Sequence, residues 1–340
     1  MYNSREITIK IDKLPGTAKN YLLINQLINE IQSTNDIEGV KSTRKEISDA
    51  IDAQESTRNV RFKQTINMYF EMLNSEKLEI LTLSDIRDIY DKVVSDEIDE
   101  EEQPDGELFR KKSVQVYDQR KEKAVHRGNP DEETVSKDLL KLIDFMNNDE
   151  SVYVIKAIVT HYYFEYIHPF YDGNGRMGRF LLASYLSHKL DDFSALSLSE
   201  SIFNNKKKYE EAFIDVSSPK NYGDLTLFIQ SMLQIIIKGQ KRIIQDIELA
   251  NLKMKRMASY IEDHNFTDDQ SSILFIMLQK HIFSLDDKTF ENRELEKYTE
   301  MARSRIDKNL KELEELGYIN KIKRKPLTYE FNEDMLPFFD

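Results

Sequence analysis

The segment that decides the fold is HPFYDGNGRMGR, which runs from His168 to Arg179. Three of the chain's ten glycines fall inside it. The stretch before it, 151–167, is apolar on nearly every side, and Pro169 prevents a helix there from continuing. Apolar residues recur at helical spacing after it. The pattern predicts two largely buried helices joined by a glycine-rich loop.

The loop has the composition of an anion-binding site. Gly173 and Gly175 permit left-handed backbone angles and the close approach of a ligand. Exposed N–H groups at the start of the following helix would form a concave site that the helix dipole strengthens. Arg176 and Arg179 stand on neighbouring faces of its first turn, where arginine opposes the dipole unless an anion is close. The two guanidinium groups together can hold a polyphosphate.

Two further side chains add chemistry to this cradle. His168 is of the residue type suited to proton transfer near neutral pH. Asp172 can carry a divalent cation, since Mg²⁺ is usually bound by one or two carboxylates together with substrate phosphates. Each feature alone has a common structural explanation: a histidine beside a proline, a tight turn, a helix cap. Their combination in this order predicts phosphoryl or nucleotidyl transfer.

The segment resembles the motif HxFx(D/E)GNGRxxR of the Fic family, and every fixed position is matched. The resemblance implies a mainly α fold, in which a helical Fic core carries a β-hairpin flap. It implies an enzyme, a protein adenylyltransferase that uses ATP as substrate and Mg²⁺ as cofactor to attach AMP to a hydroxyl side chain of a target protein. Because Gly175 and Arg176 are both kept, AMP transfer is favoured over phosphorylation.

The resemblance also implies a role for each position of the motif. His168 is the base that deprotonates the target hydroxyl, whose oxygen attacks the α-phosphate of ATP while pyrophosphate leaves. Asp172 binds the Mg²⁺ ion, and Phe170 anchors the loop in the core. The nucleotide-binding residues are Gly173, Asn174, Gly175, Arg176 and Arg179.

A second motif, TNDIEG at 34–39, resembles the inhibitory motif (S/T)xxxE(G/N) of the same family. Thr34 and Glu38 lie one turn apart on one face of a predicted helix that stops near Gly39. A carboxylate that reached Arg179 would satisfy its guanidinium and occupy space that the γ-phosphate needs. The hypothesis is an enzyme held off by Glu38.

A β-hairpin is predicted at 113–127, with short strands around the polar tip 118–123. The resemblance implies that this hairpin is the flap and that the target protein binds along it by β-augmentation. The alternative is a plain surface hairpin.

The rest of the first 262 residues reads as mostly helical. Alternating Ile7, Ile9 and Ile11 predict a short strand within 1–15. The acidic stretch 95–107 predicts a solvated loop. The other predicted helices are 20–34, 44–74, 84–94, 131–147, 205–215, 225–238 and 240–262.

The C-terminal segment has a different pattern. Helices are predicted at 269–281, 291–297 and 300–316, followed by short strands at 318–323 and 327–331. Three helices and a two-stranded ribbon resemble a winged-helix domain, which can place a helix in the major groove of DNA. Eight basic and four acidic residues lie between Arg303 and Lys325. These lysines and arginines can equally solvate a helix that contacts protein.

Composition bounds these expectations. The 340 residues predict three domains: an N-terminal helical region at 1–95 with the inhibitory motif, a Fic catalytic core at 96–262 and a winged-helix-like domain at 263–340. A net charge of −13 argues against a protein that coats nucleic acid or anionic membrane. The absence of cysteine excludes disulfides and thiolate chemistry. With neither a secretory signal nor a membrane helix, a cytoplasmic location without a membrane partner is expected, and a homodimer is compatible with the sequence.

Two other functions remain open from the residues. One is a DNA-binding winged-helix regulator whose Fic core senses nucleotide without turning it over. The other keeps the enzyme but changes its chemistry, to removal of AMP or transfer of another phosphate-linked group.

Overall fold

The computed structural model describes residues 1–54, 60–74, 78–118, 123–284 and 288–335. The chain divides into two compact units. Unit 1 comprises Met1–Thr8 and Gln26–Ile243, and unit 2 comprises Ile9–Asn25 and Ile244–Asp340. Three helices, α1 (Tyr2–Ile11), α2 (Gly16–Glu38) and α12 (Thr226–Glu262), therefore contribute residues to both units.

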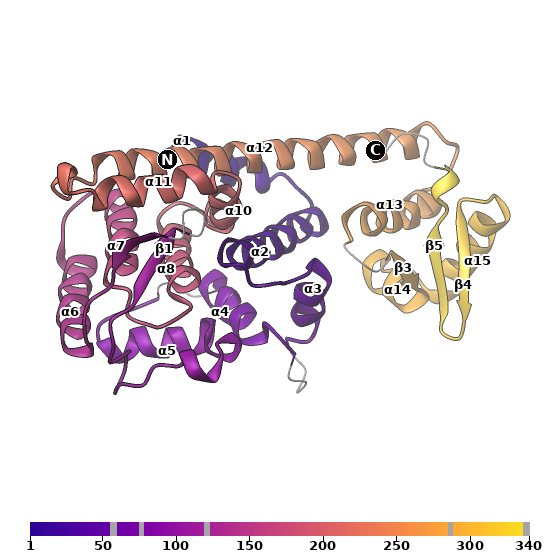
Figure 1. Cartoon of the computed structure of the whole chain (residues 1–340). Helices are drawn as coiled ribbons and strands as arrows, with labels where there is room; N and C mark the ends of the chain where they lie inside the picture. Colours follow the sequence, from indigo (N-terminus) through magenta and orange to yellow (C-terminus); the bar gives the residue numbers. More distant parts are fainter. Residues whose placement is uncertain (55–59, 75–77, 119–122, 285–287, 336–340) are drawn as a thin grey trace. The chain divides into compact units, whose positions relative to one another are not determined.

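The described part of the chain is mainly helical, as predicted (Figure 1). Short 3-10 turns lie at Ser95–Glu97, Glu100–Glu102 and Pro219–Asn221. The helices that lie wholly or partly in unit 1 are α1 (Tyr2–Ile11), α2 (Gly16–Glu38), α3 (Arg44–Asp52), α4 (Lys63–Asn74), α5 (Leu83–Val93), α6 (Glu132–Asn148), α7 (Tyr153–Ile167), α8 (Asn174–Lys189), α9 (Asp192–Leu196), α10 (Leu198–Phe203), α11 (Lys206–Ser217) and α12 (Thr226–Glu262).

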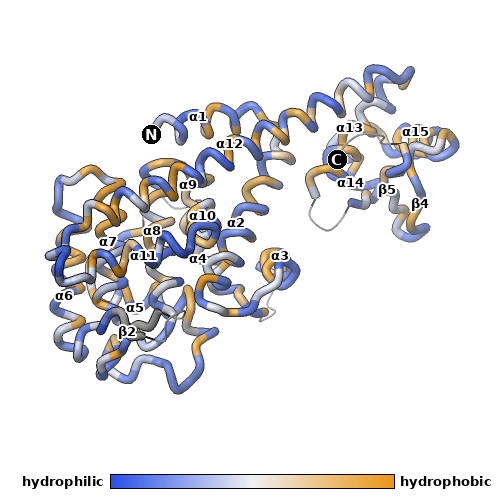
Figure 2. Tube along the Cα trace, turned by 45° about the horizontal axis from the view of Figure 1, so that its top comes forward, coloured by the Kyte–Doolittle hydropathy of each residue, from blue (hydrophilic) through white to orange (hydrophobic). Residues whose placement is uncertain are grey.

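Helices α7 and α8 form the centre of unit 1 and pack against each other. Both are buried on most sides, as their sequences predict, because apolar residues occupy more than one face. In Figure 2 the hydrophobic residues of this unit gather where its helices face one another, and hydrophilic residues cover the outward faces. The buried side chains of α8 include Met177, Phe180, Leu182 and Leu186.

The predicted strand within 1–15 is wrong, because these residues form helix α1. Ile7 and Ile11 are four residues apart and are both buried, whereas Ile9 between them is 49% exposed. The alternation of isoleucines suggested a period of two, but only the pair at helical spacing faces the core. Apolar residues that fit both periods cannot be assigned from so short a segment.

The predicted hairpin is present. Strands β1 (Gln115–Asp118) and β2 (Lys123–Arg127) pair antiparallel, with an irregularity between Val116 and Tyr117. His126 on β2 shares a 2.7 Å hydrogen bond between its Nε2 and the carbonyl oxygen of Tyr166, which ties the hairpin to α7. Most of the predicted tip, 119–122, lies outside the described residues.

Three other predictions are corrected. The single helix expected at 44–74 is two helices, α3 and α4. The two helices expected at 225–238 and 240–262 are a single helix, α12. Gly239 within it allows α12 to pack closely against Ser197, because a Cβ at this position would lie 2.5 Å from Ser197 Oγ. The stretch 95–107 is not simply solvated, because it forms two helical turns and buries Ile98.

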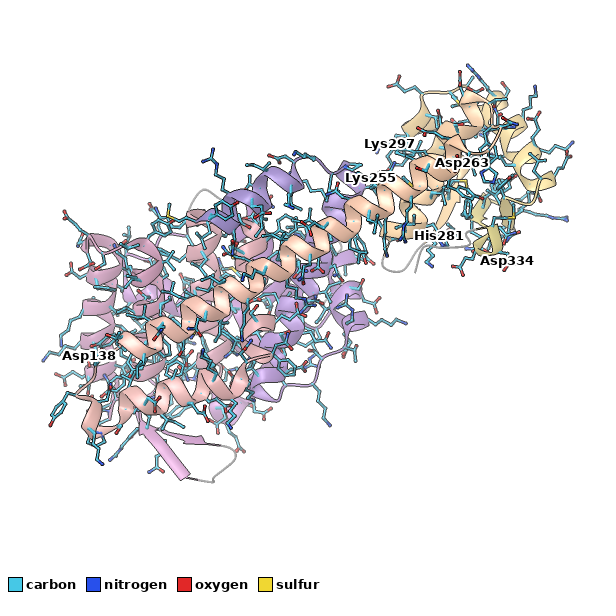
Figure 3. The ribbon with its side chains drawn as sticks, turned by 90° about the horizontal axis from the view of Figure 1, so that it is seen from above. Asp138, Lys255, Asp263, His281, Lys297 and Asp334 are labelled. Carbon is cyan, nitrogen blue, oxygen red and sulfur yellow. The ribbon has the colours of Figure 1, made fainter. Side chains whose placement is uncertain are left out.

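Unit 2 holds the C-terminal elements around a core of its own. Its sheet has the order β3 (Thr289–Glu291), β5 (Leu327–Phe331), β4 (Ile319–Arg324), and both pairings are antiparallel. Strand β3 was not predicted, since three residues are too few to show a period. Charged residues such as Lys255 and Asp334 lie on the exposed surface of unit 2 (Figure 3). Its further elements are α13 (Asp268–Phe283), β3 (Thr289–Glu291), α14 (Asn292–Thr299), α15 (Arg303–Glu315), β4 (Ile319–Arg324), β5 (Leu327–Phe331) and a 3-10 turn at Glu333–Met335.

In the ranges that the structure describes, every helix is too short or too polar to cross a membrane.

The assignment of α1 predicts unequal effects at Ile7 and Ile9, which are two residues apart. Ile7→Ala should lower the free energy of unfolding by about 2–4 kcal/mol, because it leaves a cavity in the core. Ile9→Ala, the matched control, should change it by less than about 1 kcal/mol. Denaturant titration of both variants measures the difference. Equal losses would contradict the helix.

Candidate active site

The loop between α7 and α8 has an unusual backbone at both ends. His168 ends α7 with left-handed angles, φ 54° and ψ 66°, which are uncommon for a residue with a side chain. Gly173 precedes α8 with φ 81°, where glycine is the natural residue. The loop therefore reverses the chain within five residues and presents His168 beside the start of α8.

Arg110 fixes the backbone at the His168 end of the loop. It is fully buried, and its Nε donates to the carbonyl oxygen of His168 at 2.7 Å. Its terminal nitrogens donate to the carbonyl oxygens of Ile167, at 3.3 Å, and Asn129, at 2.7 Å. A single guanidinium thus satisfies several carbonyls that a turn of this shape would leave unpaired.

Phe170 and Asn174 hold the middle of the loop. The side chain of Asn174 accepts from the backbone N–H of Phe170 at 3.0 Å and donates to its carbonyl oxygen at 2.9 Å. The Phe170 ring is buried, stacked on Tyr90 at 3.6 Å and edge-on to Phe109. Phe170 therefore anchors the loop, and Asn174 offers a ligand only its backbone, because its amide is already used.

His168 is half-buried and oriented as a proton acceptor. Its Nδ1 lies 3.2 Å from the carbonyl oxygen of Glu165, which can only accept, so the proton is on Nδ1 and Nε2 is the free base. Burial lowers the pKa of His168 to about 4, and the nearby positive charge of Arg110 lowers it further against the opposing effect of the Glu165 carbonyl and the Glu38 carboxylate. The imidazole is therefore neutral at pH 7.

The start of α8 is already in contact with an anion, the carboxylate of Glu38. A Cβ placed on Gly175 would lie 2.0 Å from Glu38 Oε1, so only glycine leaves room for this approach. Gly173 is also confined, though less tightly, since its Cβ would lie 2.9 Å from Val94 Cγ2. The bare backbone at Gly175 gives the helix start the close access that an anionic group requires, whereas Gly173 allows close packing against apolar side chains.

Arg179 is fixed by the helix that carries the inhibitory motif. Its guanidinium is 1% exposed, and its Nη2 lies 2.7 Å from Glu38 Oε1. It also donates to Thr34 twice, from Nε to Oγ1 at 2.8 Å and from Nη2 to the carbonyl oxygen at 3.1 Å. Burial, the largest single influence, raises the pKa of Glu38, but the charge and hydrogen bond of Arg179 together with the charge of Arg176 outweigh it, and the pKa is lowered. The pair is thus ionised at neutral pH.

Arg176 is also buried but held more loosely. Its Nη1 lies 3.5 Å from Glu97 and its Nη2 lies 3.6 Å from Asp172. The Asp172 carboxylate is 53% exposed. No cluster of three or more metal-ligating side chains occurs in the described ranges. Asp172 therefore fits Mg²⁺ only as one hard oxygen ligand, with phosphates and water completing the shell.

The structure brings all the predicted site residues together around the α7–α8 loop, including Thr34 and Glu38 from α2. Sequence reasoning missed two contributors, Arg110 and Glu97. Arg110 lies just before the hairpin and belongs to no recognisable motif. Glu97 lies in the acidic stretch 95–107, whose composition suggested solvent exposure. Neither position carried a signal that would have separated it from its charged neighbours.

Residues 80–186 match the family profile described as Fic/DOC family. The chain contains a Fic domain. A stretch of 72 residues is 38% identical to a probable protein adenylyltransferase of Aquifex aeolicus, and it covers 21% of this chain and 20% of that protein. The match thus spans about a fifth of that relative's length.

Two solved structures are similar over a longer span. A Fic family protein from Desulfovibrio desulfuricans superposes with a TM-score of 0.57 at 19% identity, over 98% of this chain and 96% of that one. A Fic domain-containing signalling protein from Bacteroides thetaiotaomicron gives a TM-score of 0.50 at 19% identity, over 73% of this chain and 95% of that one. At these identities the likeness establishes the fold, which is that of Fic proteins.

The two hydrogen bonds of Asn174 predict a structural role within the Fic domain. Asn174→Ala should lower the free energy of unfolding by about 1–3 kcal/mol, since it leaves the buried N–H and carbonyl of Phe170 unpaired. Asn148→Ala, at an exposed position in α6, is the control and should have little effect. Denaturant unfolding measures both. An unchanged stability of the Asn174 variant would show that water replaces the amide.

Proposed function

We propose that this chain is a protein adenylyltransferase that transfers AMP from ATP to a hydroxyl side chain of a target protein and is autoinhibited by Glu38. The observation that carries the proposal is the free Nε2 of a neutral His168, placed beside a helix start with two buried arginines. The Fic domain and the name of the Aquifex relative support a transferase of this type.

His168 provides the proton acceptor. Its Nε2 takes the proton of the target hydroxyl as that oxygen attacks the α-phosphorus of ATP. The new oxygen–phosphorus bond forms while the bond to the β-phosphate bridging oxygen breaks, and pyrophosphate leaves with that electron pair. The Nδ1–H bond to the Glu165 carbonyl keeps the ring in the required tautomer throughout.

The start of α8 provides the nucleotide site. Gly173, Asn174 and Gly175 are proposed to form the phosphate site, with the N–H of Gly173 donating to Asp172 Oδ1 until a ligand binds, and Arg176 and Arg179 hold the phosphates by charge. Asp172 would hold Mg²⁺ that arrives with ATP, and the ion when bound neutralises phosphate charge. The target protein is proposed to lie along hairpin β1–β2, which is fastened to α7 through His126.

Glu38 provides the inhibition. Its carboxylate forms an ion pair with the Arg179 guanidinium and fills the space beside Gly175. While this ion pair persists, a terminal phosphate can neither pair with Arg179 nor enter that space. Thr34 adds two hydrogen bonds to the same guanidinium from one turn earlier on α2. ATP must displace this carboxylate or bind in a pose that leaves Arg179 unused.

We further propose that the C-terminal elements form a winged-helix domain and that the protein works in the cytoplasm, alone or as a homodimer. Lys308 and Lys311 on α15 pair with glutamates one turn on. Lys321 on β4 lies 3.0 Å from Glu314. This internal neutralisation weakens the case for a DNA-binding regulator and favours the enzyme.

Transfer of label from ATP tests the proposal directly. In the presence of Mg²⁺, Glu38→Gly should increase labelling of protein from α-labelled ATP by about 10-fold or more, the equivalent of one hydrogen bond to a charged group. Adding His168→Ala should reduce it by at least ~100-fold. Radiolabel retained on denatured protein is the measurement.

Asp36→Gly is the matched control. Like Glu38→Gly, it removes a carboxylate and lowers helix propensity in α2, but the Asp36 side chain does not contact Arg179. Labelling should therefore stay low. Label from γ-labelled ATP would show phosphorylation instead. Release of AMP from pre-labelled protein would show removal. A sequence-selective DNA shift without any label would support the regulator.

The pKa of His168 predicts the pH dependence of transfer. The base form exists above the pKa, so activity is lost as pH falls through it. In the Glu38→Gly variant, kcat/KM should fall only near pH 4 or below, because it reports the free enzyme. The kcat profile should fall at a higher pH, because bound polyphosphate raises the pKa of His168. Initial rates against pH measure both, and coincident profiles would contradict this assignment.

A further inference from the structure

Glu97 lies between two arginines at the edge of the candidate active site. It belongs to the 3-10 turn Ser95–Glu97 that follows α5, and its side chain is 8% exposed. One oxygen, Oε2, lies 3.5 Å from Arg176 Nη1 and 3.6 Å from Arg61 Nη2. Both distances exceed those of charge-assisted hydrogen bonds, about 2.7–2.9 Å. Glu97 therefore acts on Arg176 mainly through its charge and leaves the guanidinium N–H groups available to a ligand.

Arg176 has a carboxylate at each of its terminal nitrogens, and the two differ in burial. Asp172, on Nη2, is half-exposed, so water screens its charge. Glu97, on Nη1, is buried and is screened less. The inner carboxylate thus has the larger influence on how the Arg176 guanidinium is oriented.

Arg61 keeps Glu97 in place from the other side. Its Nη1 donates to the carbonyl oxygen of Lys41 at 2.8 Å and lies 3.7 Å from Glu46. Its guanidinium also covers the ring of Phe62 at 4.3 Å. Glu97 therefore lies between two cations, Arg61 and Arg176, and its buried charge acts on the Arg176 guanidinium from one side.

We propose that Glu97 is a positioning residue for the transfer reaction: its charge orients Arg176 toward the nucleotide polyphosphate while reducing the attraction of Arg176 for that polyphosphate in the ground state. The inference rests on the proposed function. It predicts two opposed effects when the charge is removed at constant size. KM for ATP falls, because a negative charge beside the polyphosphate is gone, and kcat falls, because Arg176 is less well oriented in the transition state.

Steady-state AMP transfer in the Glu38→Gly background tests this. Glu97→Gln should lower KM for ATP roughly threefold or more and lower kcat about tenfold. Glu97→Asp, which keeps the charge, should retain the KM of the parent. Glu101→Gln is the matched control, the same change at an exposed position of the same loop, and should alter neither constant.

An unchanged or raised KM for Glu97→Gln would overturn the proposal. A merely structural role would lower kcat alone, and for the Gln and Asp variants alike, by reducing the folded fraction. If the Glu38→Gly parent transfers no label, the proposed function fails, and calorimetric titration with ATP and Mg²⁺ then tests Glu97. Tighter binding by the Gln variant than by the Glu101 control supports the proposal, and equal binding overturns it.

Discussion

The guanidinium of Arg179 is almost wholly removed from water, and the C-terminal part of α2 supplies the groups that pair with it. A buried charge is tolerated only when it is paired and hydrogen-bonded, because its desolvation costs several kcal/mol. Helix α2 supplies both requirements, with the carboxylate of Glu38 and the hydroxyl and carbonyl of Thr34. The same guanidinium is the group proposed to hold phosphate. Inhibition and nucleotide binding are therefore alternative ways of meeting one electrostatic demand.

Around this pair the loop from His168 to Gly173 is held by contacts that do no chemistry themselves. Arg110 satisfies the carbonyls beneath it, Asn174 closes it across Phe170, and the Phe170 ring stacks on Tyr90. Such support matters because a reacting group displaced by about 1 Å can lose about 100-fold in rate. The side chains that support the loop are thus distinct from His168 and Asp172, the loop residues proposed to act on the substrate.

The sequence predicted the helical fold because the α7 segment is a long apolar run ended by Pro169, and apolar residues recur at helical spacing in α8. It predicted the hairpin because two short strand-like segments flank a polar tip. Most candidate site residues could be identified from the sequence because they lie within one twelve-residue motif. The inhibitory motif added Thr34 and Glu38. Arg110 and Glu97 were not predictable, since their roles arise only from tertiary contacts. The error at α1 has the same origin: Ile7, Ile9 and Ile11 fit two periods, and only packing decides between them.

Gly175 leaves a volume over α8 that the Glu38 carboxylate enters and that a phosphate is proposed to enter in its place. Any side chain there would exclude both occupants at once. Mutation at Gly175 therefore cannot separate regulation from activity, whereas mutation on α2 can. Selection for a more active enzyme would consequently act on α2 and leave the loop unaltered. The absence of a side chain at Gly175 thus confines mutations that change inhibition without changing activity to α2.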